Sequence, residues 1–336
     1  MILRMRLQLE SEKTVTQETE YYKAINWNAI EDVVDKATWE KLTEQFWLDT
    51  RILLSNDLDD WRRLSEKERD LVGKVFGGLT LLDTLQSVVG VSAIRQDIRT
   101  PHEDAVLNNI AFMEAIHAKS YSSIFSTLNT KSEIEEIFEW TATNQYLQKK
   151  AEIIKRIYDT GNPLQKKVAS VFLESFLFYL GFFTPLWYLG NNKLPNVAEI
   201  IKLIIRDESV HGTYIGYKFQ LAFNELFEGE QEELKAWIYD LLYELYENEE
   251  KYTEELYDEI GWTEEVKTFL RYNANKALMN LGLDPLFPES AEDVNPIIMN
   301  GISTGTSNHD FFSQVGNGYL LGQVESMEDA DYMVGL

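Results

Sequence analysis

The chain contains 336 residues, of which 44% are hydrophobic and 12% aromatic, and this is enough to bury a sizeable core. Acidic residues outnumber basic ones by 56 to 31, and the formal net charge of −25 repels a nucleic-acid backbone or an anionic membrane surface. Because the chain has no cysteine, disulfides, thiolate zinc sites and cysteine nucleophiles are excluded, and a metal site would use oxygen and nitrogen ligands.

The first 24 residues show neither a helical period nor an apolar targeting segment. We therefore expect a flexible extension without a site, on a cytoplasmic protein. The longest apolar run, residues 176–189, is interrupted by glycine and proline and is shorter than the roughly 20 residues that cross a membrane. It predicts a buried core helix, and neither a membrane nor nucleic acid is an expected partner.

Amphipathic periodicity predicts three helices in the first 130 residues. The first covers about residues 37–48 and ends before a loop at 55–57. The second, 65–89, begins with a capping box and keeps apolar spacing through Val88. The third, 100–128, begins with a threonine cap and a proline at the first helical position.

The remaining helices follow after clear breaks. Periodicity and turn residues predict them at about residues 131–158, 163–189, 195–215, 230–258 and 263–281. Strand-like alternation is absent from the sequence. We therefore expect an all-α fold, with one helical domain over residues 25–290 followed by an extended segment and a flexible tail over 291–336.

Two Glu-x-x-His motifs carry the first chemical signal, Glu114 to His117 and Glu208 to His211. At helical spacing each glutamate and its histidine lie on one face. Since 56 of the 336 residues are acidic, about one histidine in six has an acid three positions earlier by chance. The spacing alone is therefore weak evidence for a metal site, and the apolar helices in which the motifs lie provide the stronger evidence.

That setting is a group of apolar helices, two more of which carry a carboxylate, Asp83 and Glu174. Four buried charges without partners would be prohibitively unstable, but two divalent cations would neutralise them. Two carboxylates and two Glu-x-x-His motifs are the ligand set of ferritin-like long-helix bundles with a di-metal carboxylate site. Carboxylate and imidazole without thiolate suit iron or manganese, and the donor set does not choose between them.

Tyr121 lies one turn beyond His117 on the same helical face. A tyrosine in an apolar helix is more often a core residue than a redox centre, but its place beside the expected ligands favours a redox role. The other two histidines have no buried pattern. We interpret His102 as a helix-start residue and His309 as a loop residue.

Together these residues match a known family. Over residues 24–319 the chain resembles the small, radical-generating beta subunit of class I ribonucleotide reductase, and most closely class Ib. The resemblance rests on six segments, namely residues 78–83, 112–121, 170–175, 206–211, 272–282 and 308–312. The extension before Ala24 has no counterpart in it.

The resemblance implies a homodimer in which a manganese or iron pair oxidises Tyr121 to a stable radical. The implied ligands are Asp83, Glu114, His117, Glu174, Glu208 and His211. Trp47 and Asp207 near His117, with Tyr319 in the tail, would pass the radical to the large subunit that reduces ribonucleoside diphosphates. Residues 325–336 would bind that large subunit, and a flavodoxin-like activating protein would assist manganese loading.

Two other functions use the same ligand types. A related di-metal oxidase or oxygenase would turn over its own substrate and would need neither Tyr319 nor the tail. A ferritin-like storage protein would form a cage and hold many metal ions per chain.

Overall fold

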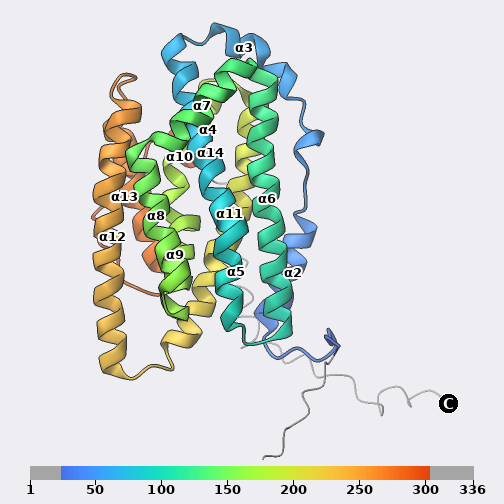
Figure 1. Cartoon of the computed structure of the whole chain (residues 1–336), viewed down its shortest axis with the longest axis vertical. Helices are drawn as coiled ribbons and strands as arrows, with labels where there is room; N and C mark the ends of the chain where they lie inside the picture. The colour runs from blue at the N-terminus through green and yellow to red at the C-terminus, as the bar shows by residue number, and fades with distance from the viewer. Residues whose placement is uncertain (1–23, 303–336) are drawn as a thin grey trace, which may run out of the picture.

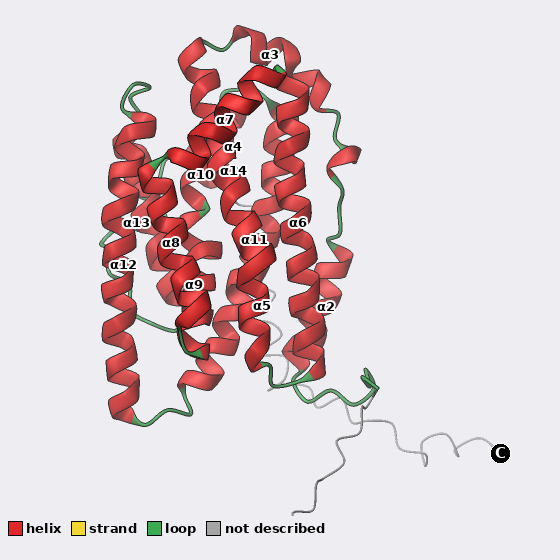
Figure 2. Ribbon diagram, viewed as in Figure 1, coloured by secondary structure: helices red, strands yellow, loops and turns green. Residues whose placement is uncertain are grey.

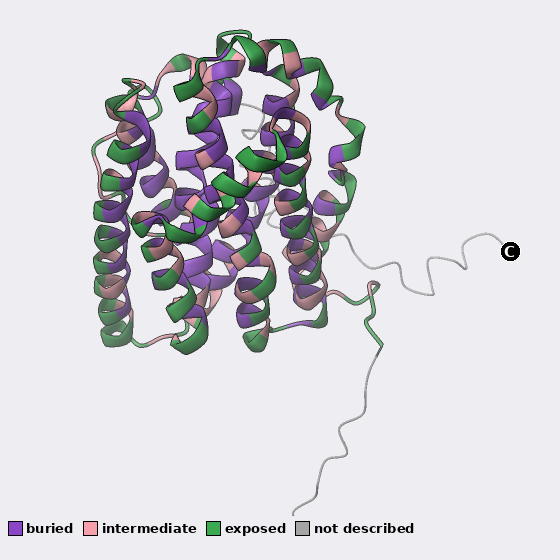
Figure 3. Ribbon diagram, turned by 45° about the horizontal axis from the view of Figure 1, so that its top comes forward, coloured by how far each residue is buried: buried purple, intermediate pink, exposed green. Residues whose placement is uncertain are grey.

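The computed structural model describes residues 24–302, and in that range the protein is a bundle of helices without a β-strand (Figure 2). The predicted all-α, ferritin-like architecture is confirmed. Long helices stand side by side along the longest dimension of the molecule, with α12 (Glu228–Tyr257) and α6 (Pro101–Leu128) toward opposite sides of the view (Figure 1). Buried residues line the inner faces of these helices and exposed residues the outer faces (Figure 3).

Four further helices of the bundle surround the core together with α6 and α12. They are α4 (Glu66–Leu85), α9 (Pro163–Phe172), α11 (Pro195–Phe223) and α13 (Thr263–Asn280). The other helices are α2 (Val33–Glu44), α3 (Leu58–Arg63), α5 (Val91–Ile94), α7 (Lys131–Thr143), α8 (Gln145–Thr160), α10 (Tyr179–Gly190) and α14 (Pro296–Ile302). Single turns of 3₁₀ helix form η1 (Asp49–Arg51), η2 (Leu54–Asp57) and η4 (Arg95–Asp97).

Helix starts follow the local sequence signals. The Ser65 hydroxyl accepts a hydrogen bond from the Glu68 backbone N–H, while the Glu68 carboxylate accepts one from the Ser65 N–H, so two of the unpaired donors at the start of α4 are satisfied. Thr100 caps α6 in the same way through Glu103 N–H, and Pro101 occupies the first turn. These caps fix the N-terminal ends of the two helices that carry Asp83 and the first Glu-x-x-His motif.

Two π-helical turns interrupt the apolar helices next to the predicted ligands. The turn η3 (Gln86–Gly90) follows α4, and η5 (Leu173–Leu177) joins α9 to α10. Each turn inserts extra residues relative to α-helical spacing and therefore rotates the following face. Val88 is 67% exposed, and at about 100° per residue it lies on the side of the helix opposite the buried Leu79.

Two helical stretches, Glu66–Asp97 and Pro163–Gly190, are long and apolar enough to cross a membrane by length and composition alone. Their most apolar windows are 61% and 100% buried inside the protein, which identifies them as core helices. The prediction that residues 176–189 form a buried core helix is confirmed, and these residues belong to η5 and α10.

Two local expectations, the end of the first helix and the exposure of His102, differ from the structure. The first helix, α2, ends at Glu44 rather than near residue 48, because Trp47 turns inward from a loop to reach α11. His102 begins α6 as expected but is buried, since its Nε2 lies 3.1 Å from the Asn26 carbonyl oxygen and Trp27 packs against its ring. His309 lies outside the described residues.

The segment expected to be extended from residue 291 contains the helix α14. Asn295 caps it through the Ile297 N–H, and α14 packs against α10 so closely that Ile297 would contact a Cβ at Gly190. Burial of Ile298 against α10 stabilises this short helix, although its polar flanks predict a loop. The remaining tail, with Tyr319, and the extension before residue 24 are outside the described residues.

Candidate metal centre

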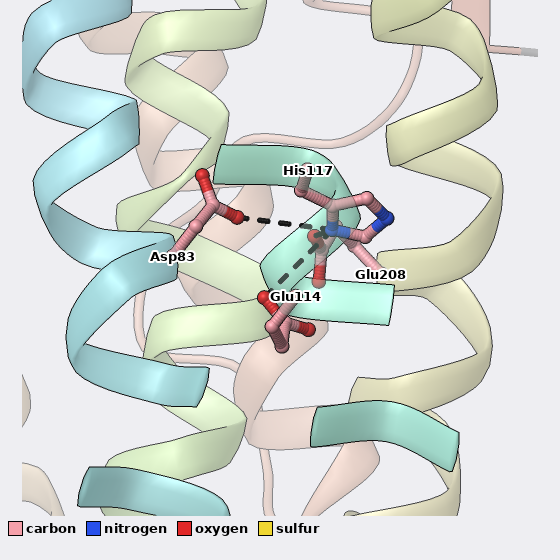
Figure 4. A group of neighbouring side chains, drawn as sticks. All are labelled: Asp83, Glu114, His117 and Glu208. Carbon is pink, nitrogen blue, oxygen red and sulfur yellow. Dashed lines mark ion pairs between the residues drawn. The ribbon is translucent and has the colours of Figure 1, made fainter. Parts of the chain in front are cut away.

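Six of the predicted side chains meet in the core of the bundle. They form two groups that share Glu114 and Glu208, and within each group the potential ligand atoms lie within 4.8 Å of one another. The groups are Asp83, Glu114, His117 and Glu208, and Glu114, Glu174, Glu208 and His211. We call them the His117 half-site and the His211 half-site. Figure 4 shows the His117 half-site, in which Asp83 from α4 and the other side chains converge on one space.

The two Glu-x-x-His motifs face each other from α6 and α11, and each histidine contacts the glutamate of the other motif. His117 Nδ1 lies 2.9 Å from Glu208 Oε1, and His211 Nδ1 lies 2.8 Å from Glu114 Oε1. Within its own motif, by comparison, His117 Nδ1 is 3.7 Å from Glu114 Oε2. This reciprocal arrangement places both Nδ1 atoms toward the space between the helices and makes each glutamate accessible to both half-sites.

The donor atoms of the cluster are buried and lack ordinary hydrogen bonds. All six residues are at most 1% exposed. Within residues 24–302 no hydrogen-bond partner exists for either carboxylate oxygen of Asp83, Glu114 and Glu208, for Glu174 Oε2, or for Nδ1 of either histidine. Buried polar atoms without partners are strongly destabilising, so atoms of this kind that converge on one space fit divalent cations.

Burial and the mutual repulsion of the carboxylates shift the pKa values of the acidic residues in the cluster. Burial, reinforced by the Glu114 charge, raises the pKa of Asp83 and of Glu174 well above the usual range. Burial opposes ionisation of Glu208 too, but the neighbouring Glu174 carboxyl and the His117 imidazole, whose Nδ1 lies 2.9 Å from Glu208 Oε1, hold its pKa below the usual value. In the protein alone Asp83 and Glu174 therefore favour their protonated forms, and bound cations would take the place of those protons.

Beyond the His117 half-site a hydrogen-bonded chain leads outward. His117 Nε2 lies 3.2 Å from Asp207 Oδ2, and the Trp47 indole N–H donates to the same oxygen at 2.7 Å. The Trp47 and His117 rings are stacked with centroids 6.0 Å apart. Gln45 and Arg206 donate to the other carboxylate oxygen, Asp207 Oδ1. The structure thus brings together Trp47, Asp207 and His117.

Tyr121 is fully buried beside the cluster. Its hydroxyl has no hydrogen-bond partner in the described part of the chain, and Phe76 packs against its ring at a centroid distance of 5.7 Å. Burial, followed by the charges of Asp83 and Glu208, raises the pKa of its phenol well above 10. The side chain is therefore a neutral phenol in a dry, apolar setting.

Sequence reasoning missed a second set of contacts, on the His211 half-site. Gln86 donates from Nε2 to Glu174 Oε1 at 2.5 Å and to Ser170 Oγ at 2.7 Å, and the Tyr158 hydroxyl donates to Gln86 Oε1 at 2.6 Å. A single polar amide three residues after Asp83 in an apolar helix was the available signal. Its partners lie 72 to 88 positions away, so spacing could not identify them.

The chain is similar in sequence and fold to known proteins. The family model described as "Ribonucleotide reductase, small chain" matches residues 24–296. The chain is 53% identical over 310 residues to ribonucleoside-diphosphate reductase 2 subunit beta of Escherichia coli (strain K12), which covers 92% of this chain and 97% of the relative. It is 52% identical over 310 residues to ribonucleoside-diphosphate reductase subunit beta nrdF2 of Mycobacterium tuberculosis (strain ATCC 25618 / H37Rv), with coverage of 92% and 96%.

A solved structure agrees with these relatives. The crystal structure of Streptococcus sanguinis dimanganese(II)-NrdF superposes with a TM-score of 0.83 at 83% sequence identity, and the match covers 84% of this chain and all of that one. The buried carboxylate and histidine cluster of the present chain suits a dinuclear metal site. The chain therefore belongs to the ribonucleotide reductase small-chain family, the radical-generating beta subunits of the oxidoreductase ribonucleoside-diphosphate reductase.

Proposed function

We propose that the two half-sites bind a pair of manganese or iron ions and that Tyr121 is the residue oxidised to the stable radical. The observation that carries this proposal is the set of buried carboxylate and imidazole atoms without hydrogen bonds, arranged on two reciprocal Glu-x-x-His motifs. The proposed ligands are Asp83, Glu114, His117, Glu174, Glu208 and His211. Oxygen and nitrogen donors suit both metals, and the Streptococcus sanguinis relative is described as a dimanganese(II) protein.

When bound and oxidised, the metal pair supplies the one-electron oxidant. The raised pKa keeps the Tyr121 phenol protonated before oxidation. On oxidation Tyr121 would give one electron to the metal pair and its phenolic proton to the adjacent Asp83 carboxylate, whose charge acts on this phenol. Its fully buried ring excludes water and external reductants, which favours a long-lived radical. Phe76 contributes an apolar contact to this protection.

The hydrogen bonds among Trp47, Asp207 and His117 support a route from the metal pair to the protein surface. We assign to them the transfer of the radical toward the large subunit, with Tyr319 as a later carrier and residues 325–336 as the docking segment. We also propose a cytoplasmic homodimer that receives its metal with help from a flavodoxin-like activating protein. Neither Tyr319 nor the docking segment is among the described residues.

The decisive experiment combines metal analysis with electron paramagnetic resonance. After loading with manganese or iron and oxidation, the wild-type protein should contain about two ions per chain and show a tyrosyl signal. The Tyr121→Phe variant should bind the same number of ions and lose that signal completely, because only the phenolic oxygen is removed. A tyrosyl signal that persists in the variant would contradict the assignment. A cage-sized oligomer with many ions per chain would instead indicate metal storage.

A further inference from the structure

The Gln86 carboxamide lies between Glu174 on one side and Ser170 and Tyr158 on the other. It is completely buried, as is Ser170, and Tyr158 is 2% exposed. Both ends of the amide are occupied: Nε2 donates to Glu174 and Ser170, and Oε1 accepts from the Tyr158 hydroxyl. Because the oxygens of an ionised carboxylate can only accept hydrogen bonds, the NH₂ end of Gln86 faces Glu174, and the Tyr158 hydroxyl, which donates to Oε1, holds the amide in that orientation.

This orientation has a direct consequence for Glu174. Its Oε1 is held by Gln86, whereas Oε2 has no hydrogen bond within residues 24–302 and lies 3.5 Å from His211 Nδ1. One oxygen is thus engaged away from the cluster and the other faces it. The other carboxylates of the cluster have both oxygens free of hydrogen bonds in the same range. Glu174 is therefore the carboxylate whose orientation the protein restricts most.

The backbone around Gln86 leaves room for its contacts with Glu174 and Tyr158. Gln86 begins the π-helical turn η3 and Glu174 lies in the π-helical turn η5. At Gly90, the last residue of η3, an added Cβ would lie 2.1 Å from Gln86 Oε1 and 2.8 Å from the Tyr158 ring. A side chain there would displace the amide or the tyrosine, so the glycine provides the space that both occupy. π-Helical turns often occur at functional sites.

We infer that Gln86, oriented by Tyr158 and Ser170, is a positioning residue that makes Glu174 a one-oxygen ligand through Oε2 and thereby sets the metal affinity of the His211 half-site. The inference rests on the proposed metal-binding role of Glu174. Its physical basis is that outer hydrogen-bond partners restrict the orientation of a metal ligand before the ion arrives. Loss of such a partner typically weakens metal binding by about 10- to 100-fold.

The test is a manganese titration of the full-length chain with two variants. Gln86→Met keeps the volume but removes the amide, and Tyr158→Phe keeps Gln86 but removes the hydroxyl that orients it. We expect Gln86→Met to bind one of its two ions about tenfold or more weakly while the other affinity is unchanged, and Tyr158→Phe to show a smaller loss at the same ion. A crystal structure of the manganese-loaded Gln86→Met variant should show Glu174 with both oxygens turned toward the ions.

Tyr257→Phe is the matched control, because it removes another fully buried hydroxyl whose hydrogen bonds go to Thr184 and to the Leu180 carbonyl. Tyr257→Phe should lower the free energy of unfolding, as the loss of a buried hydroxyl in Tyr158→Phe also should, but it should leave the affinities for both ions unchanged. The inference is overturned if Gln86→Met keeps both wild-type affinities and the wild-type Glu174 orientation, or if Tyr257→Phe gives the same affinity loss. A wild-type chain that fails to bind two ions would overturn the proposed metal site as well.

Discussion

The two half-sites have the same kinds of ligand but opposite surroundings. On the His117 side, Asp207 accepts hydrogen bonds from Trp47 and Gln45 and contacts His117 Nε2, so charged and aromatic groups lead outward. On the His211 side, Gln86 and Tyr158 enclose Glu174 with neutral groups, and His211 Nε2 has no hydrogen-bond partner within the described range. The same kinds of ligand are thus placed in different surroundings: a carboxylate and an indole extend the hydrogen bonding of the His117 half-site, and an amide and a phenol hold one oxygen of Glu174 at the His211 half-site.

The largest expected effect comes from removing a ligand that both half-sites share. Glu208 belongs to both groups, whereas Glu174 belongs to one. We expect Glu208→Ala to weaken the binding of both ions by more than about 100-fold, because ligand loss should exceed the effect of losing an outer partner. Glu174→Ala should weaken mainly one. Metal content after gel filtration, measured by mass spectrometry, distinguishes the two variants. Equal losses in both would contradict the division into half-sites.

A smaller and more selective effect is expected on the outward route. In Asp207→Asn the negative charge between the Trp47 indole N–H and His117 Nε2 is lost. An NH₂ group also replaces one carboxylate oxygen, so the amide cannot accept from Gln45 and Arg206 while its oxygen serves Trp47 and His117. Radical yield should stay close to that of the wild-type protein, while turnover with the large subunit should fall by about 10- to 100-fold or more.

Spin quantitation and turnover, measured on the same Asp207→Asn sample, test this separation. Gln86→Met provides the matched comparison, since it alters the opposite half-site and should change metal affinity first. Loss of radical in Asp207→Asn with normal turnover per radical would show that Asp207 serves metal loading instead of transfer.

The parts of this site that follow local rules could be predicted from sequence, and the parts that depend on distant contacts could not. Helical spacing identified Glu114 with His117 and Glu208 with His211, because residues three apart always share a helix face. Apolar character alone did not indicate burial at Val88, which is 67% exposed because it lies on the side of the helix opposite Leu79. Gln86 carries no spacing signal, since its role depends on residues from two other helices.

The smallest expected effect concerns the loop that carries Trp47. Asp49, two residues later, is 3% exposed and accepts hydrogen bonds from Lys119 and Ser123 of α6 at 2.6 and 2.5 Å. Burial alone would raise the pKa of Asp49, but these hydrogen bonds and the Lys119 charge hold it below 3.8. The unfolded chain therefore takes up the proton more readily than the folded one as the pH falls.

The Asp49→Asn variant isolates this contribution to the free energy of unfolding. At neutral pH we expect it to be less stable than the wild-type protein by about 1 kcal/mol, a modest value because Lys119 is largely exposed. The stabilisation is present above 3.8, the ordinary pKa of an aspartate, and is lost as the pH falls through the lowered pKa. Urea unfolding of both proteins across that range should show the difference shrinking. A difference that stays constant with pH would mean that Asp49 stabilises the contact between the Trp47 loop and α6 through packing and hydrogen bonds that do not depend on its charge. In that case Asp207 would be the only one of these two aspartates whose charge matters near the His117 half-site.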